Sequence, residues 1–171
     1  MDRAGEFFDC ENAMKELATY LSDHLAGANA AVELLEHLTE SHRGTPIGRF
    51  FEELHADVTS DRDVLGKLLQ RFSKESALKK TGAWIAEKFN RVKLRLAGEK
   101  RGELGLVEAL EILVLGITGK QLLWRALSVS LGESPLLRGI DLSQLEQRAI
   151  DQLERVEAHR LEAARQVFLR G

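Results

Sequence analysis

The sequence is poor in proline, cysteine and aromatic residues. Only Pro46 and Pro135 occur among 171 residues, so nearly the whole chain is free to be helical, because proline removes a backbone donor. This scarcity argues against a turn-rich sandwich or barrel. The single cysteine, Cys10, cannot form an internal disulfide, which makes a reducing compartment the expectation. The length suits one globular domain, residues 1–171, with a full hydrophobic core.

Long apolar runs and a dominant sign of charge are also missing. The longest apolar stretch, residues 112–117, has six residues, whereas a membrane span needs about 20. The first ten residues contain acids and no apolar run of signal-peptide length. We therefore expect a cytoplasmic protein with no membrane span. Lys and Arg number 24 against 27 Asp and Glu, and the net charge of −3 argues against a nucleic-acid binder that uses its whole surface.

What the sequence has instead is helical periodicity. Apolar residues recur every three or four positions along four long segments, and at heptad spacing along a shorter fifth one. Gly44 can close the first helix in the left-handed conformation, and Thr45 with Pro46 supplies an N-cap and a first-turn proline for the second. Asp141 or Ser143 caps the last helix. The predicted helices are residues 11–41, 46–73, 78–97, 103–130 and 141–169.

The order of these helices predicts an all-α bundle of two hairpins. Short breaks near residues 43 and 133 join the first helix to the second and the fourth to the last, so each pair is antiparallel. The connection between the hairpins is itself as long as the bundle and carries the fifth, basic amphipathic helix. A four-helix bundle with one long crossover follows, in which the second and fourth helices run parallel.

This helix order resembles that of the ferritin-like superfamily over most of the chain. More locally, three segments look like a group of bacterial ferritin-like proteins without an established activity. These segments are YLSDHLAG at 20–27, KKTGAWIAEKFNRVKLRL at 79–96 and ELGLVEALEILVLGITGKQLLWRAL at 103–127. The resemblance implies a ferritin-like fold and a cytoplasmic setting, but it implies no particular activity.

Carboxylates and histidines recur where the predicted helices reach the same depth. Di-iron proteins of the ferritin-like superfamily bind metal through one Glu from each of two helices and a Glu-x-x-His from each of the other two. Glu52 and His55 form one such motif, but a second motif ending at His159 would need glutamate where Val156 stands. An iron or manganese pair and solvated helix-face carboxylates both stay open. The candidate ligands are Glu33, Glu36, Glu52, His55, Glu108, Glu111, Glu154 and His159.

A second polar layer interrupts two of the apolar stripes. Lys120 occupies a core position of the fourth predicted helix, and Asp61 with Arg62 fills the gap in the second. A buried ammonium is costly unless it is paired, so Lys120 demands a partner, for which Asp61 or Asp23 is suited. In one interpretation, the Lys120 side chain extends between the helices to solvent and His24 is an ordinary core histidine. In the other, these groups form a buried network, which either replaces a lost metal site or lines a small pocket. The candidate network is His24, Asp23, Asp61, Arg62 and Lys120.

The predicted crossover is the most basic part of the chain. Residues 79–101 contain eight Lys and Arg against two Glu, a local charge of +6. Such a face can bind the phosphates of nucleic acid or an anionic membrane surface, or it can be solvated against acidic neighbours in the bundle or in a homodimer. The candidate residues are Lys79, Lys80, Lys88, Arg91, Lys93 and Arg95.

Motifs for nucleotide binding and for common hydrolytic chemistries do not occur in the sequence. It contains no Walker loop, G-x-G-x-x-G, H-E-x-x-H, C-x-x-C or G-x-S-x-G. We therefore expect a non-enzymatic helical bundle with a degenerate metal site, a buried polar network and no cofactor. A di-iron carboxylate oxidase or iron-binding protein is one alternative, and binding of an anionic surface through the basic helix is another.

Overall fold

The computed structural model describes residues 3–75 and 102–169, and it is all-helical over these ranges. The all-α class predicted from the sequence is therefore confirmed for the described residues. The predicted helix at 78–97 lies outside them. The described elements are α1 (Arg3–Ser41), α2 (Pro46–Glu75), α4 (Gly102–Leu131), the 3₁₀ turn η1 (Pro135–Leu137) and α5 (Leu142–Phe168).

The first turn follows the sequence signals, whereas the start of α1 does not. The prediction that α1 begins near residue 11 is wrong: the helix begins at Arg3, since the preceding segment contains no proline to stop it. In the turn, Gly44 has a φ of 79°, a left-handed value that glycine adopts without strain. The Oγ1 atom of Thr45 accepts from the backbone N–H of Gly48 at 3.1 Å, which caps α2 just before Pro46.

The second turn is built in the same way. Ser134 is the N-cap of η1 and is followed directly by Pro135. Of the two caps expected for α5, Asp141 is the one observed: its side chain accepts from the Gln144 backbone N–H at 2.9 Å, and Ser143 lies inside the first helical turn. Each proline therefore marks the bend of one hairpin.

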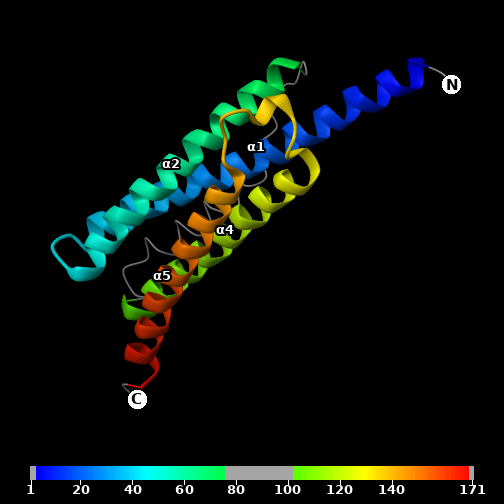
Figure 1. Ribbon diagram of the computed structural model, residues 1–171. Coiled ribbons are helices and arrows are strands. Elements are labelled where there is room, and N and C mark those ends of the chain that lie inside the picture. The colour runs from blue at the N-terminus through cyan, green and yellow to red at the C-terminus, as the bar shows by residue number, and fades with distance from the viewer. Residues whose placement is uncertain (1–2, 76–101, 170–171) are drawn as a thin grey trace.

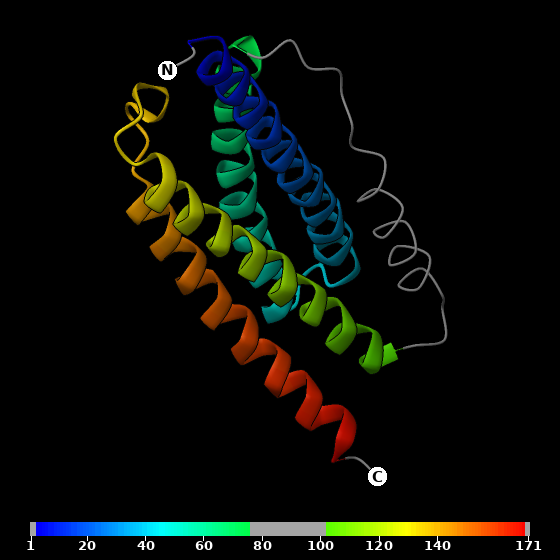
Figure 2. The ribbon, with the colours of Figure 1, turned by 90° about the vertical axis from the view of Figure 1, so that its right-hand side faces the viewer.

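The four helices form two antiparallel hairpins that pack across one another. In Figure 1, α1 pairs with α2, and α4 pairs with α5. Figure 2 shows that α2 and α4 run in the same direction and that α1 and α5 run in the opposite one. Most tertiary contacts lie within the hairpins, while α1 meets α4 and α2 meets α5 and η1 across the junction. Arg71 secures η1, because its Nη1 atom donates to the carbonyls of Leu136 and Arg138 at 2.9 and 3.0 Å.

The core lies between the two hairpins, and the predicted stripes supply most of it. Phe51, Phe72 and Trp124 are the largest fully buried side chains. On α5, the apolar periodicity predicts Leu153 as an inward residue, but Leu153 is only partly buried and the neighbouring Gln152 is buried to 2% exposure.

Helix α4 is apolar on more than its core-facing side. Leu115, Leu122 and Val129 are exposed to 72%, 54% and 86% on a face that the predicted stripe did not include. They recur every seven residues and so form one line along the helix. Even so, an apolar stretch sufficient to cross a bilayer is found neither in α4 nor in the other helices that the structure describes.

The tight first turn predicts a strong contrast between two glycines. A Cβ added at Gly48 would lie 2.1 Å from the backbone oxygen of His42, whereas one added at Gly116 would meet nothing within 4 Å. Gly48→Ala should lower the free energy of unfolding by about 1–3 kcal/mol, because the turn must open to admit the methyl group. Gly116→Ala should raise it by about 0.5–1 kcal/mol through helix propensity. Urea denaturation measures both, and equal effects would contradict the described turn.

Candidate functional site

A buried polar network joins the two hairpins at the centre of the bundle. Lys120 of α4 donates from Nζ to Asp61 Oδ2 of α2 at 2.7 Å and also to Gln152 Oε1 of α5. Gln152 Nε2 donates to the same Asp61 oxygen at 3.1 Å. Arg148 Nη2 lies 3.0 Å from Asp61 Oδ1, in an ion-pair contact rather than an aligned hydrogen bond. The Asp61 side chain is 1% exposed, so a fully buried carboxylate is contacted from two helices of the other hairpin.

The electrostatics of the network are set by burial. The Lys120 side chain is 14% exposed, and burial lowers the pKa of its ammonium, although the charge and the hydrogen bond of Asp61 oppose this shift. An unpaired ammonium at this depth would be costly, so the carboxylate is needed to keep the charged form. The network is therefore a paired charge inside the bundle, which makes its two partners interdependent.

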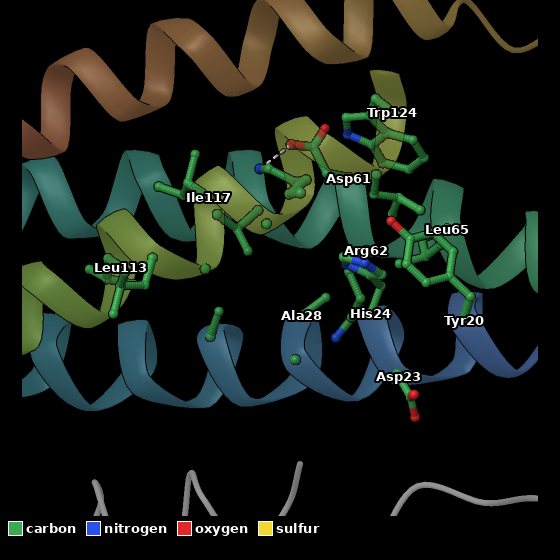
Figure 3. Close-up of a pocket in the computed structure, with 18 residues that line it drawn as sticks. Tyr20, Asp23, His24, Ala28, Asp61, Arg62, Leu65, Leu113, Ile117 and Trp124 are labelled. Atoms are coloured by element: carbon green, nitrogen blue, oxygen red, sulfur yellow. Dashed lines mark hydrogen bonds and ion pairs between the residues drawn. The ribbon is translucent and has the colours of Figure 1, made fainter. Parts of the chain in front are cut away.

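Of the five network candidates from the sequence, the structure joins only Asp61 and Lys120 to each other. His24 makes an edge-to-face contact with Tyr20, with ring centroids 4.6 Å apart, and hydrogen bonds connect it to no described residue. Arg62 donates to its neighbour Asp63 at 2.7 Å. In Figure 3, Asp23 lies on the far side of α1 from Asp61, so it is not the partner of Lys120.

Sequence reasoning missed two members of the network. Gln152 occupies the inward position of α5 between Ala149 and Val156, at steps of three and four residues. A polar residue at a core register is therefore visible in the sequence, but the apolar residue next to it, Leu153, was the one predicted to face inward. Arg148 gave no such signal, because its side chain is 35% exposed and only the guanidinium reaches Asp61.

Beside the network lies a pocket of about 400 Å³ between α1, α2 and α4. Its walls are mostly apolar, and small residues at Gly27, Ala28 and Ala31 of α1 and at Gly116 and Gly119 of α4 leave the space unfilled. The Cβ positions of Gly27 and Gly116 meet no atom within 4 Å. The pocket therefore exists because the facing residues of α1 and α4 have little or no side chain.

Polar groups line the pocket at two places. Figure 3 shows Asp61 near Trp124, with the dashed line marking its ion pair with Lys120, while His24 and Arg62 lie together nearer α1. Burial lowers the pKa of His24, and the charge of Asp23 partly opposes this. The pocket thus combines apolar walls with the charged network at one end and a largely uncharged histidine at the other.

The candidate metal ligands are spread over all four described helices. They are Glu33 and Glu36 of α1, Glu52 and His55 of α2, Glu108 and Glu111 of α4, and Glu154 and His159 of α5. Five of them are exposed, namely Glu33, Glu36, Glu52, Glu111 and Glu154. Within residues 3–75 and 102–169, no three His, Cys, Asp or Glu side chains are grouped closely enough to hold a metal ion.

The contacts of these side chains explain why they do not gather around one point. His55 Nε2 lies 3.5 Å from Glu36 Oε1, so these two candidates are in contact. Glu111 faces the guanidinium of Arg160 at 3.5 Å. The ring of His159 packs on Phe50 with centroids 4.0 Å apart. In the described arrangement these three side chains thus contact a carboxylate, a guanidinium and an aromatic ring, and the binding of an iron or manganese pair stays a prediction.

The basic candidates Lys79, Lys80, Lys88, Arg91, Lys93 and Arg95 lie outside the described residues. Compared with protein-family models, with curated proteins and with solved structures, the chain matches none. The pocket and the network are therefore the features from which a function is inferred.

The network predicts strong coupling between its two charges. Lys120→Met leaves the buried carboxylate of Asp61 with only the partly exposed Arg148 as a counter-charge, and Asp61→Asn leaves the buried ammonium of Lys120 with none, so each should lower the free energy of unfolding, by up to about 3–5 kcal/mol. The double variant should lose much less than the sum, because the amide introduced at position 61 can still exchange a hydrogen bond with the amide of Gln152. Chemical denaturation of the four proteins measures the coupling.

A matched control is available at the surface. Arg125 and Glu146 also join α4 to α5, at 2.6 Å, but the Arg125 side chain is 57% exposed. The cycle of Arg125→Met and Glu146→Gln should show a coupling below about 1 kcal/mol. Equal coupling in the two cycles would show that the network behaves as an exposed ion pair.

The histidines predict a loss of stability on mild acidification. Burial lowers the pKa of His24 and of His159, the latter with help from the positive charge of Arg155. The unfolded chain then binds protons more readily than the folded one. The stability that the two neutral histidines contribute is therefore fully present above the ordinary histidine pKa of about 6.5, and it is lost as pH falls below that value. His24→Gln should therefore lose less stability than the wild type between about pH 7.5 and pH 5. An NMR titration of His24 at or above its ordinary pKa would contradict this.

Proposed function

We propose that this protein is a non-enzymatic helical bundle that binds a small, mostly apolar molecule between α1, α2 and α4. The observation that carries the proposal is the pocket of about 400 Å³ whose apolar walls end on a buried polar network. Cavities of roughly 300–1,000 Å³ with apolar walls and a few convergent polar groups are typical of small-molecule sites. Empty space in this position also costs stability, since core side chains normally fill such gaps.

The titratable groups support binding rather than catalysis. A catalytic lysine needs a free, deprotonated amine, but the Lys120 ammonium donates to Asp61 and Gln152. A general base is usually oriented by a hydrogen bond to a third group, and His24 has none among the described residues. The pocket therefore offers positioned donors and apolar walls without a linked acid, base and nucleophile.

We also propose that the bundle is ferritin-like with a degenerate metal site. The parallel course of α2 and α4 supports this topology, because such a pair requires a crossover as long as the bundle. The scattered carboxylates and the pairing of Lys120 with Asp61 support the loss of the metal site, since an ammonium in the interior repels cations.

Filling the pocket tests the proposed binding function. Gly27→Leu places a side chain into open space, so the helix should tolerate it while the pocket loses volume. The neutral dye N-phenyl-1-naphthylamine, which fluoresces in apolar surroundings, should bind the wild type in a saturable way with one site per chain. Gly27→Leu should weaken this binding at least tenfold in a fluorescence titration.

Ala126→Leu is the matched control, because Ala126 is exposed on α4 and does not line the pocket. This variant should bind the dye like the wild type. Circular dichroism and urea denaturation verify that both variants are folded. Undiminished dye binding by folded Gly27→Leu would place the dye elsewhere and contradict the proposal.

A further inference from the structure

A residue of the pocket lining has a buried indole N–H without a hydrogen-bond partner in the described part of the chain. Trp124 lines the pocket and is fully buried, and its Nε1 atom makes no hydrogen bond to the described residues. In the view of Figure 3, the nitrogen-bearing edge of this indole faces the side on which Asp61 lies. Buried tryptophan N–H groups usually find an acceptor, because leaving one unpaired costs about 1–3 kcal/mol. This donor therefore calls for an acceptor that the described part of the chain does not supply.

Lys120 contributes a second donor at the same end of the pocket. An ammonium has three N–H groups, and the contacts of Lys120 Nζ with Asp61 and Gln152 use two of them. Lys120 also lines the pocket. One of its protons is therefore left for a molecule in the pocket, since the described residues provide no third acceptor.

Most acceptors beside these donors are already engaged. Asp61 Oδ2 accepts from both Lys120 and Gln152, and Gln152 Oε1 accepts from Lys120. Asp61 Oδ1 makes no hydrogen bond, but it lies 3.0 Å from the guanidinium of Arg148. A cationic amine that approached this oxygen would also approach Lys120 and Arg148, and like charges repel, so an oxygen atom that accepts hydrogen bonds suits this end of the pocket better.

The charge balance favours an uncharged oxygen. The ammonium of Lys120 is paired with Asp61 at 2.7 Å, and the second cation beside Asp61, the guanidinium of Arg148, belongs to a side chain that is 35% exposed and is therefore screened by solvent. A ligand carboxylate would lose its hydration and approach the Asp61 carboxylate, and both effects are unfavourable. A carbonyl oxygen accepts two hydrogen bonds without adding a charge.

We propose that the pocket binds an uncharged, predominantly apolar molecule through one carbonyl oxygen, of the ketone or ester class, which accepts from Trp124 Nε1 and Lys120 Nζ. This assignment rests on the proposed binding function and adds the chemical class of the ligand. The apolar remainder of the molecule lies along the small residues of α1 and α4. The volume of the pocket, about 400 Å³, limits the size of the whole molecule.

Calorimetric titration of the full-length protein with three eight-carbon probes tests the class. The probes are 2-octanone, octanoate and octylamine, which share an apolar chain and differ in the polar end. The wild type should bind 2-octanone at least threefold more tightly than either charged probe, because only the ketone accepts from both donors without adding a charge. This comparison needs no variant, so it stands even where a substitution disturbs folding.

Trp124→Phe tests the indole donor, since it keeps an aromatic ring and removes the N–H. Its affinity for 2-octanone should fall by about three- to tenfold, the range expected for one hydrogen bond. Its affinity for N-phenyl-1-naphthylamine, which brings no carbonyl oxygen, should fall less than its affinity for 2-octanone, because the smaller ring costs both molecules contacts and the missing N–H weakens only the binding of the ketone. Urea denaturation confirms that the variant is folded.

The outcomes separate the ligand class from the binding function. Tighter binding of octanoate or octylamine than of 2-octanone would overturn the ligand class and leave the pocket function intact. An unchanged ketone affinity in folded Trp124→Phe would also overturn it. Failure of both the dye and all three probes to bind the wild type would overturn the proposed function itself.

Discussion

The pairing of Asp61 with Lys120 is the constraint on which the arrangement of the two hairpins depends. A carboxylate that is 1% exposed needs its charge balanced, and every group that contacts it here comes from the other hairpin: Lys120 from α4, Gln152 and Arg148 from α5. Apolar packing alone tolerates sliding of one helix pair over the other by a turn. A buried charge does not, because a shift would leave it without partners. The network therefore fixes the register of the hairpins while the surrounding leucines supply most of the burial.

The same junction explains why a pocket is present. Large residues such as Phe51 and Phe72 fill much of the bundle. Beside Asp61, α1 and α4 instead contribute glycine and alanine to the lining of the pocket, so side chains are missing there. The charged end and the open space of the pocket thus come from two different features of the sequence. The charges of Asp61 and Lys120 lie within the apolar stripes of α2 and α4, and the space arises where α1 and α4 have glycine and alanine.

The sequence determined the helices and their turns well, because those depend on local signals. Gly44 and Thr45 ended and capped helices by rules that act within a few residues, and the stripes of α2 and α4 gave the core. The network was only partly predictable. Lys120 and Asp61 stood out as charges in apolar stripes, but Gln152 was missed, since a neutral amide interrupts a stripe less visibly. The pocket was not predictable from α1 or α4 singly, because small residues create space only where two helices lack side chains opposite each other.

The crossing of the hairpins also bears on the order of assembly. Contacts within each hairpin join residues close in sequence and form early, whereas contacts across the junction close long loops. Docking the hairpins requires Asp61 and Lys120 to shed their water before their mutual attraction is gained, so this late step carries a desolvation barrier. The pocket comes into being only when that step is complete. A bound molecule would therefore stabilise the docked state. It would slow the separation of the two hairpins more than the fraying of either hairpin.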